Sequence, residues 1–111
     1  MDQKLIESLS NKYKDYENSD KFIIACFIVF EDDKPASVKS FIERTFSANN
    51  FAECTSGVFY SLAAHWLNIS KSKLDLEDYK NHVYSAITSA KLRCIAKFLE
   101  THPTPDLGVN N

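Results

Sequence analysis

Hydrophobic residues recur every three or four positions over four stretches of the chain, residues 2–17, 35–47, 50–68 and 76–101. This spacing places them on one face of an α-helix. Residues 20–31 form a fifth stretch that contains the most apolar run, Phe22 to Phe30. For an apolar run this short, the spacing of hydrophobic residues cannot distinguish a helix from a strand. We favour a helix, because no second strand is evident to pair with its backbone groups.

Polar breaks separate these stretches. Asn18, Ser19 and Asp20 offer an N-cap for the second stretch, and Pro35 suits the first turn of the third. Residues 72–78 hold two overlapping capping-box patterns, and the pair at 102–103, His-Pro, ends the last stretch. The sequence therefore predicts an all-α protein. It would be a compact bundle of about five helices over 2–17, 20–31, 35–47, 50–68 and 76–101, in a single domain at 1–102 with a flexible, disordered tail at 103–111.

The last two stretches differ from the others. In 50–68, Glu53 is the only charged residue, so this helix is either the centre of the bundle or keeps an apolar face for a partner. The final stretch carries an apolar stripe at steps of three and four: Leu76, Tyr79, Val83, Ile87, Ala90, Cys94 and Phe98. It would be about 39 Å long, whereas a globule of this chain length is roughly 34 Å across. It therefore either bends near Ser85, Thr88 and Ser89 or projects and packs on another molecule, for instance in a homodimer.

Composition narrows the class of protein. The 111 residues are 44% hydrophobic and 25% charged, with a net charge of −2, which fits one globular core. The start of the chain lacks the apolar run of a secretory signal, and the run at Phe22 is too short to cross a membrane. Cys26, Cys54 and Cys94 are odd in number and lie among apolar neighbours, as reduced core thiols do. We expect a soluble, cytoplasmic protein outside the membrane.

Residue spacing offers no site for catalysis or for a cofactor. The closest cysteine–histidine pair, Cys94 and His102, is eight residues apart, too far for one turn to present two metal ligands. Apolar surroundings would raise the pKa values of the three thiols and silence them as nucleophiles. Gly57 and Gly108 belong to no glycine-rich phosphate loop. We expect no metal, no cofactor and no enzymatic activity.

Residues 64–70, Ala-His-Trp-Leu-Asn-Ile-Ser, resemble the histidine-phosphotransfer signature over seven positions. In that signature an exposed helical His is followed by Leu, a Lys-Gly pair and Ser. The resemblance implies a phosphoryl-accepting role for His65. This chain has Asn68 and Ile69 where the family carries the Lys that neutralises the phosphoryl group and the Gly that admits the partner. A core or interface histidine on an apolar helix is therefore the favoured interpretation, and His82 and His102 are expected at the surface and at a helix end.

Residues 79–99 carry four cations and no acid: Lys80, Lys91, Arg93 and Lys97. On a helical wheel they flank the apolar stripe along two edges and do not form a single basic track. The chain as a whole is negative and shows no interleaving of aromatic and basic residues, so nucleic-acid binding is disfavoured.

These observations favour a small non-enzymatic protein that binds another protein, of the inhibitor, immunity, antagonist or adaptor type. Aromatic and basic side chains anchor such interfaces, and the candidates here are Tyr60, Trp66, Tyr84, Lys91 and Arg93, with Trp66 better suited to the core. The alternative is a histidine phosphocarrier or small enzyme centred on His65. A nucleic-acid-associated regulator is the weakest of the three hypotheses.

Overall fold

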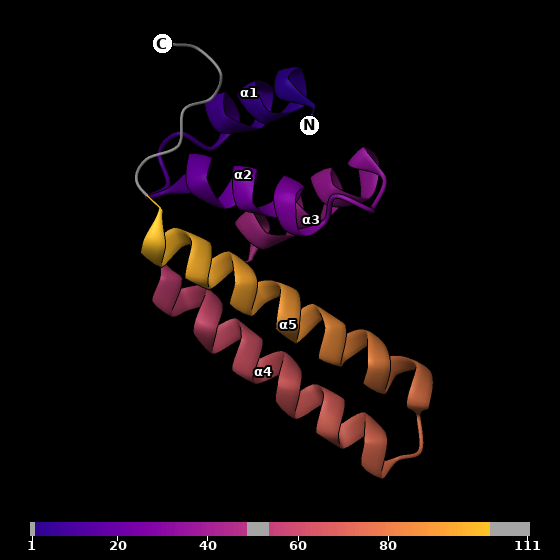
Figure 1. Cartoon of the computed structure of the whole chain (residues 1–111). Coiled ribbons are helices and arrows are strands. Elements are labelled where there is room, and N and C mark those ends of the chain that lie inside the picture. Colours follow the sequence, from indigo (N-terminus) through magenta and orange to yellow (C-terminus); the bar gives the residue numbers. More distant parts are fainter. Residues whose placement is uncertain (1, 49–53, 103–111) are drawn as a thin grey trace.

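The computed structural model describes residues 2–48 and 54–102, and this part of the chain consists of five α-helices without a strand (Figure 1). They are α1 (Gln3–Lys12), α2 (Ser19–Val29), α3 (Pro35–Ser47), α4 (Ser56–Asp75) and α5 (Tyr79–Thr101). The all-α prediction is confirmed, and the ambiguous stretch 20–31 is a helix. The tail at 103–111 and residues 49–53 lie outside the described residues. The predicted helix start at 50 is wrong, because Thr55 is the N-cap and α4 begins at Ser56.

Two predicted helix ends are wrong, and local side chains explain both. Helix α1 ends at Lys12, and the following turn lets Tyr13 stack on Phe46 of α3, with ring centroids 4.0 Å apart. Helix α4 continues to Asp75, seven residues past the predicted end at 68. The N–H of Glu77 then donates to the Leu74 carbonyl (3.0 Å), and that of Asp78 donates to the Lys73 carbonyl (2.8 Å). This is a Schellman cap whose left-handed residue, normally glycine, is Glu77 at φ 58°.

Helix α2 is the central element of the bundle. Every residue from Phe22 to Phe27 is buried, because this run is apolar on all sides and needs cover on all sides. Helices α1, α3 and α5 all contact it. The Phe22 ring stacks on Phe59 of α4 at a centroid distance of 4.6 Å and meets Phe46 of α3 edge-on at 5.4 Å. The fourth segment, by contrast, is not the centre of the bundle.

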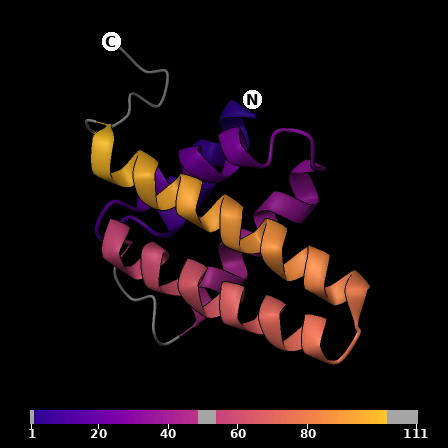
Figure 2. The same cartoon turned by 60° about the horizontal axis from the view of Figure 1, so that its bottom comes forward.

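Helices α4 and α5 form an antiparallel hairpin, and they lie side by side in both views of the ribbon (Figures 1 and 2). Small side chains line their contact, among them Ala63 on α4 and Ser85 and Ser89 on α5, all buried. The Ser89 hydroxyl donates to the Ala63 carbonyl across the contact at 2.6 Å. Small residues let the two backbones approach closely and leave little room for large apolar side chains.

One polar cluster holds the far half of the hairpin together. The Ser70 hydroxyl of α4 donates to the His82 carbonyl of α5 at 2.9 Å. The His82 Nδ1 atom lies 2.8 Å from the Ser70 carbonyl oxygen and 2.9 Å from the Ser70 Oγ. A proton on Nδ1 satisfies both oxygen acceptors. His82, expected at the surface, is therefore half-buried and part of the helix contact.

The rotation of α5 differs from the prediction. The buried residues of α5 are Ser85, Ser89, Leu92, Ile95, Ala96 and Leu99. Six residues of the predicted apolar stripe are exposed. Leu76 precedes α5, and we call the five on the helix the outer stripe: Tyr79, Val83, Ile87, Ala90 and Cys94. The predicted apolar stripe is therefore not the face of α5 that packs in the bundle, because α4 packs on the face with Ser85 and Ser89, which continues the buried Leu92–Leu99 face toward the helix start.

The hairpin makes the molecule elongated. Its extents are 50 × 26 × 24 Å, and the end of the hairpin with the α4–α5 connection projects beyond α1, α2 and α3 (Figure 1). Of the two sequence alternatives for the long last helix, the structure shows the projection, with α4 alongside α5 (Figure 1). Packing of the projecting end on another molecule stays a prediction. No helix in the described ranges combines the length and the apolarity needed to cross a bilayer. The cytoplasmic location stays a prediction.

Candidate protein-binding groove

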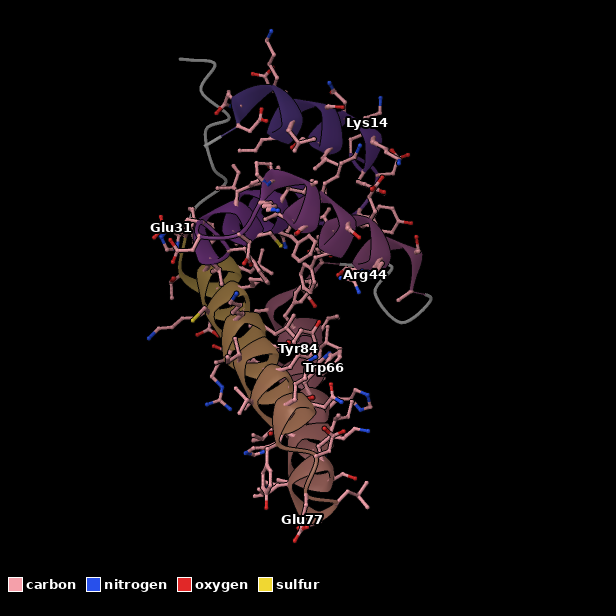
Figure 3. The ribbon with its side chains drawn as sticks, turned by 90° about the vertical axis from the view of Figure 1, so that its right-hand side faces the viewer. Lys14, Glu31, Arg44, Trp66, Glu77 and Tyr84 are labelled. Atoms are coloured by element: carbon pink, nitrogen blue, oxygen red, sulfur yellow. The ribbon has the colours of Figure 1, made fainter. Side chains whose placement is uncertain are left out.

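Two of the predicted contact residues meet where the hairpin joins the other helices. Trp66 on α4 and Tyr84 on α5 are in edge-on contact, with ring centroids 6.2 Å apart and an interplanar angle of 80°. Figure 3 shows both side chains near Arg44, at the end of α3. Tyr84 is 55% exposed, whereas Trp66 is partly buried against the core. The Trp66 side chain thus packs against the core and is also partly accessible at the surface.

Two adjoining hollows, of about 270 and 340 Å³, open at this junction. Both are lined by Phe41 and Arg44 of α3 and by Tyr84 and Thr88 of α5. Trp66 closes the first hollow, and Ile87 and Lys91 line the second. We call the combined feature the aromatic groove, defined by Phe41, Arg44, Trp66, Tyr84, Ile87 and Lys91. It combines apolar walls with cations at the rim, which is the usual chemistry of an anchor pocket in a protein interface.

The two cations of the groove are held differently. The Lys91 ammonium lies 3.3 Å from Asp33 Oδ2 and 4.4 Å from the centroid of the Phe30 ring. These contacts tie α5 to the turn between α2 and α3, so Lys91 is partly a structural residue. Arg44 donates its Nε–H to the Ser40 carbonyl at 3.3 Å. A guanidinium has four further N–H donors, and no hydrogen bond of theirs is described within residues 2–48 and 54–102.

The other two predicted contact residues lie elsewhere. Tyr60 of α4 is 37% exposed and sits beside Glu100 and Arg93 of α5. Partial desolvation and the Glu100 carboxylate raise the pKa of Tyr60, and Arg93 opposes the rise. None of these three residues lines the aromatic groove. The five sequence candidates therefore divide between two surfaces of the hairpin, Trp66, Tyr84 and Lys91 on one and Tyr60 and Arg93 on the other.

The three histidines have different surroundings. His65 is exposed and lines the hollow beside Trp66, so it is not a core histidine, and the interface alternative stays a prediction. Helix α4 buries Ala63 and Ser70, and at 100° per residue His65 points well away from that face. His102 lies at a helix end, as expected, with its ring stacked on Phe98 at a centroid distance of 3.9 Å.

The cysteines match the prediction in two of three cases. Cys26 and Cys54 are fully buried, and burial raises the pKa of the Cys54 thiol to about 12. Burial and the neighbouring Cys54 also raise the pKa of Cys26. Cys94 is exposed, because it belongs to the outer stripe and not to the core. Within residues 2–48 and 54–102, no group of three or more His, Cys, Asp or Glu side chains is placed to hold a metal ion.

Sequence reasoning missed the contribution of α3 to the groove. Neither Phe41 nor Arg44 of α3 is among the contact residues predicted from sequence. The sequence does contain a signal for this pair, because Phe41 and Arg44 are three residues apart. This spacing puts an apolar and a basic side chain next to each other on adjacent turns of the helix. Only the packing of α3 across the hairpin brings that pair to Trp66 and Tyr84.

Residues 2–48 and 54–102 thus form five helices with a projecting hairpin and an aromatic groove at its base. Comparison of the chain with known family models, curated proteins and solved structures gives no match. Function must therefore be inferred from the sequence and geometry of this chain.

Proposed function

We propose that this protein binds another protein non-enzymatically through the aromatic groove, as inhibitors, antagonists and adaptors do. The observation that carries the proposal is the convergence of Phe41, Trp66 and Tyr84 from three helices on the first hollow, with Phe41 and Tyr84 extending into the second. Aromatic side chains in concave, partly desolvated positions supply much of the binding energy in protein interfaces.

The groove fits an apolar or aromatic side chain that enters beside a hydrogen-bond acceptor. The walls would cover the apolar group, and Arg44 would donate to a carbonyl or carboxylate of the same partner segment. Lys91 contributes less as a charge, because Asp33 already neutralises it at 3.3 Å. The expected anchor is therefore one apolar residue flanked by one acceptor.

Affinity capture from the native cell tests this proposal with a matched pair of variants. Tyr84→Ala removes an exposed groove aromatic, whereas Tyr60→Ala removes an exposed aromatic on the other surface of the hairpin. We expect a stoichiometric complex with the wild-type chain and with Tyr60→Ala, and at least about tenfold weaker binding with Tyr84→Ala. Both variants should keep the wild-type melting temperature within a few degrees, because both side chains are exposed.

Two outcomes would contradict the proposal. Failure of the wild-type chain to retain any stoichiometric partner would argue against a binding function. A complex that is lost with Tyr60→Ala and kept with Tyr84→Ala would move the binding site to the other surface.

A phosphocarrier role centred on His65 is the second candidate, and one observation favours it. His65 is exposed, and Arg44 lines the same hollow, where a guanidinium could neutralise a phosphoryl group in place of the missing Lys. Incubation with phosphoramidate would then give an acid-labile phosphohistidine that His65→Ala abolishes and His102→Ala retains. No labelling, or labelling that survives His65→Ala, excludes this second candidate.

A further inference from the structure

The exposed apolar surface of this protein is concentrated on the hairpin. Eight of the nine large hydrophobic residues that are exposed in the described chain belong to α4, α5 or their connection: Tyr60, Leu67, Leu74, Leu76, Tyr79, Val83, Tyr84 and Ile87. The ninth, Ile28, is on α2. A concentration of this kind marks an interaction surface, since scattered single residues are the normal case.

The outer stripe of α5 is the most regular part of this surface. Tyr79, Val83, Ile87, Ala90 and Cys94 follow one another at steps of four, four, three and four residues. Tyr79, Val83 and Ile87 are 59%, 52% and 50% exposed. This is the spacing of a helix-packing seam, and α4 already occupies the separate face with Ser85 and Ser89. Helix α5 therefore has two seams, and in the described structure only one is covered.

Over residues 79–99 of α5 the charges have one sign, and the acid Glu100 follows in the last turn of the helix. Between Tyr79 and Leu99 the chain carries four cations and no acid, and Lys91 alone of the four forms an ion pair within the described residues. On the helix, Lys80 lies along one edge of the outer stripe, and Arg93 and Lys97 lie along the other. A complementary surface must be apolar in the middle and acidic on both sides.

We propose that the outer stripe docks an amphipathic helix of a partner protein, with an apolar stripe flanked on both edges by Asp or Glu. This inference rests on the proposed protein-binding function and adds a second surface with a defined partner chemistry. Carboxylates along both edges would pair with Lys80 on one side and with Arg93 and Lys97 on the other, and would also orient the partner helix.

The two other occupants of such a surface fit less well. A second copy packed α5 against α5 would bring cations to cations, because this helix has no acid over residues 79–99. A membrane surface needs large apolar side chains along the whole buried face, whereas the outer stripe ends in Ala90 and Cys94. Small residues at these positions let another helix approach closely.

The test uses a fluorescent three-heptad peptide with Leu at the core positions and Glu at the flanking positions. A matched peptide carries Lys in place of each Glu. Anisotropy titrations compare the wild-type chain with Tyr79→Ser/Val83→Ser, which alters the stripe outside the aromatic groove, and with Lys80→Ser/Arg93→Ser/Lys97→Ser. Ile28→Ser and Lys39→Ser are the controls, because they remove one exposed apolar residue and one exposed cation away from the hairpin.

We expect the Glu peptide to bind the wild-type chain and both controls, with affinity that falls as salt rises. The stripe variant and the charge variant should each weaken binding by at least about tenfold. Equal binding of the Glu and Lys peptides, or binding that ignores both variants, would overturn the proposal.

If the proposal fails, two further measurements show what binds the outer stripe instead. Sedimentation that shows a wild-type dimer broken by Tyr79→Ser/Val83→Ser would assign the stripe to a second copy. Binding to phosphatidylglycerol vesicles that requires Tyr79 and Val83, without binding of the Glu peptide, would assign it to a membrane. Either result overturns the docking inference.

The captured native complex separates this inference from the proposed function. If that complex depends on Tyr84 and survives the stripe variant, the inference fails and the proposed function stands. If no complex is captured, the proposed function itself fails.

Discussion

At the scale of single residues, neighbours in space decide the chemistry of the three cysteines. All three have apolar neighbours in the sequence, which predicted three buried thiols. Cys26 and Cys54 meet this prediction, and Cys94 does not, because it lies on the outer stripe while its apolar sequence neighbours Leu92, Ile95 and Ala96 occupy the buried side of α5. Sequence reasoning found the apolar surroundings correctly but could not tell whether another helix covers them.

Thiol labelling checks this difference. In the native protein at near-neutral pH, we expect Ellman's reagent to react quickly with Cys94 and slowly with Cys26 and Cys54, whose raised pKa values and burial withhold the thiolate. Cys94→Ser should remove the fast phase, whereas Cys54→Ser should leave it intact. Two fast thiols in the wild-type protein would show that a buried cysteine is accessible.

The same pKa shift makes stability fall in alkaline solution. The Cys54 thiol has a pKa of about 12 in the folded chain, compared with an ordinary value of 9.0. Above about pH 9 the unfolded chain therefore binds fewer protons than the native chain, and the free energy of unfolding decreases as pH rises toward 12. Below pH 9 both states are protonated and the contribution is fully present.

At the scale of secondary-structure elements, the sequence predicted the number and type of the helices but not every boundary. The range 35–47 is correct, because Pro35 marks its start. The end of α4 was missed because its Schellman cap uses Glu77 in the left-handed conformation, and the usual glycine signal is absent. The rotation of α5 was missed because its exposed stripe is more apolar than its buried face with Ser85 and Ser89.

The cap at Glu77 gives a stability prediction. A non-glycine residue in the left-handed region costs about 1 kcal/mol, so Glu77→Gly should raise the free energy of unfolding by up to about this amount. Asp75→Gly, in the last turn of the same helix, is the matched control and should lower it. Urea unfolding measures both, and a loss of stability with Glu77→Gly would show that its side chain makes a contact more important than the strain.

At the scale of the whole molecule, the hairpin is packed unevenly along its length. The large buried residues of α4 and α5 lie at the end that contacts α2, and include Phe59, Leu92, Ile95 and Leu99. The projecting half buries Ser70 and Ser85, with the Ser70–His82 hydrogen bonds between the helices. Neither the groove nor this gradient could be predicted from sequence, because both depend on how α3 and the hairpin are placed in space.

Amide hydrogen exchange followed by NMR should reveal this gradient. Amides of residues 92–99 should exchange only through global unfolding, because they are buried under α2. Amides of residues 71–84 should exchange faster through local opening of the projecting half. Ser70→Ala should accelerate exchange in the second group and leave the first nearly unchanged, and equal protection of the two groups would contradict this description.

The walls of the aromatic groove belong to parts of the molecule that otherwise have few common contacts, with Phe41 and Arg44 on α3 and Trp66 and Tyr84 on the hairpin. A molecule bound between these walls would contact both α3 and the hairpin, and would link the helices α1, α2 and α3 to the hairpin. Because it would favour the native chain over the unfolded one, it would raise the melting temperature in proportion to its affinity and concentration. A thermal-shift screen of peptides and small apolar compounds could thus find occupants of the groove before any biological partner is known.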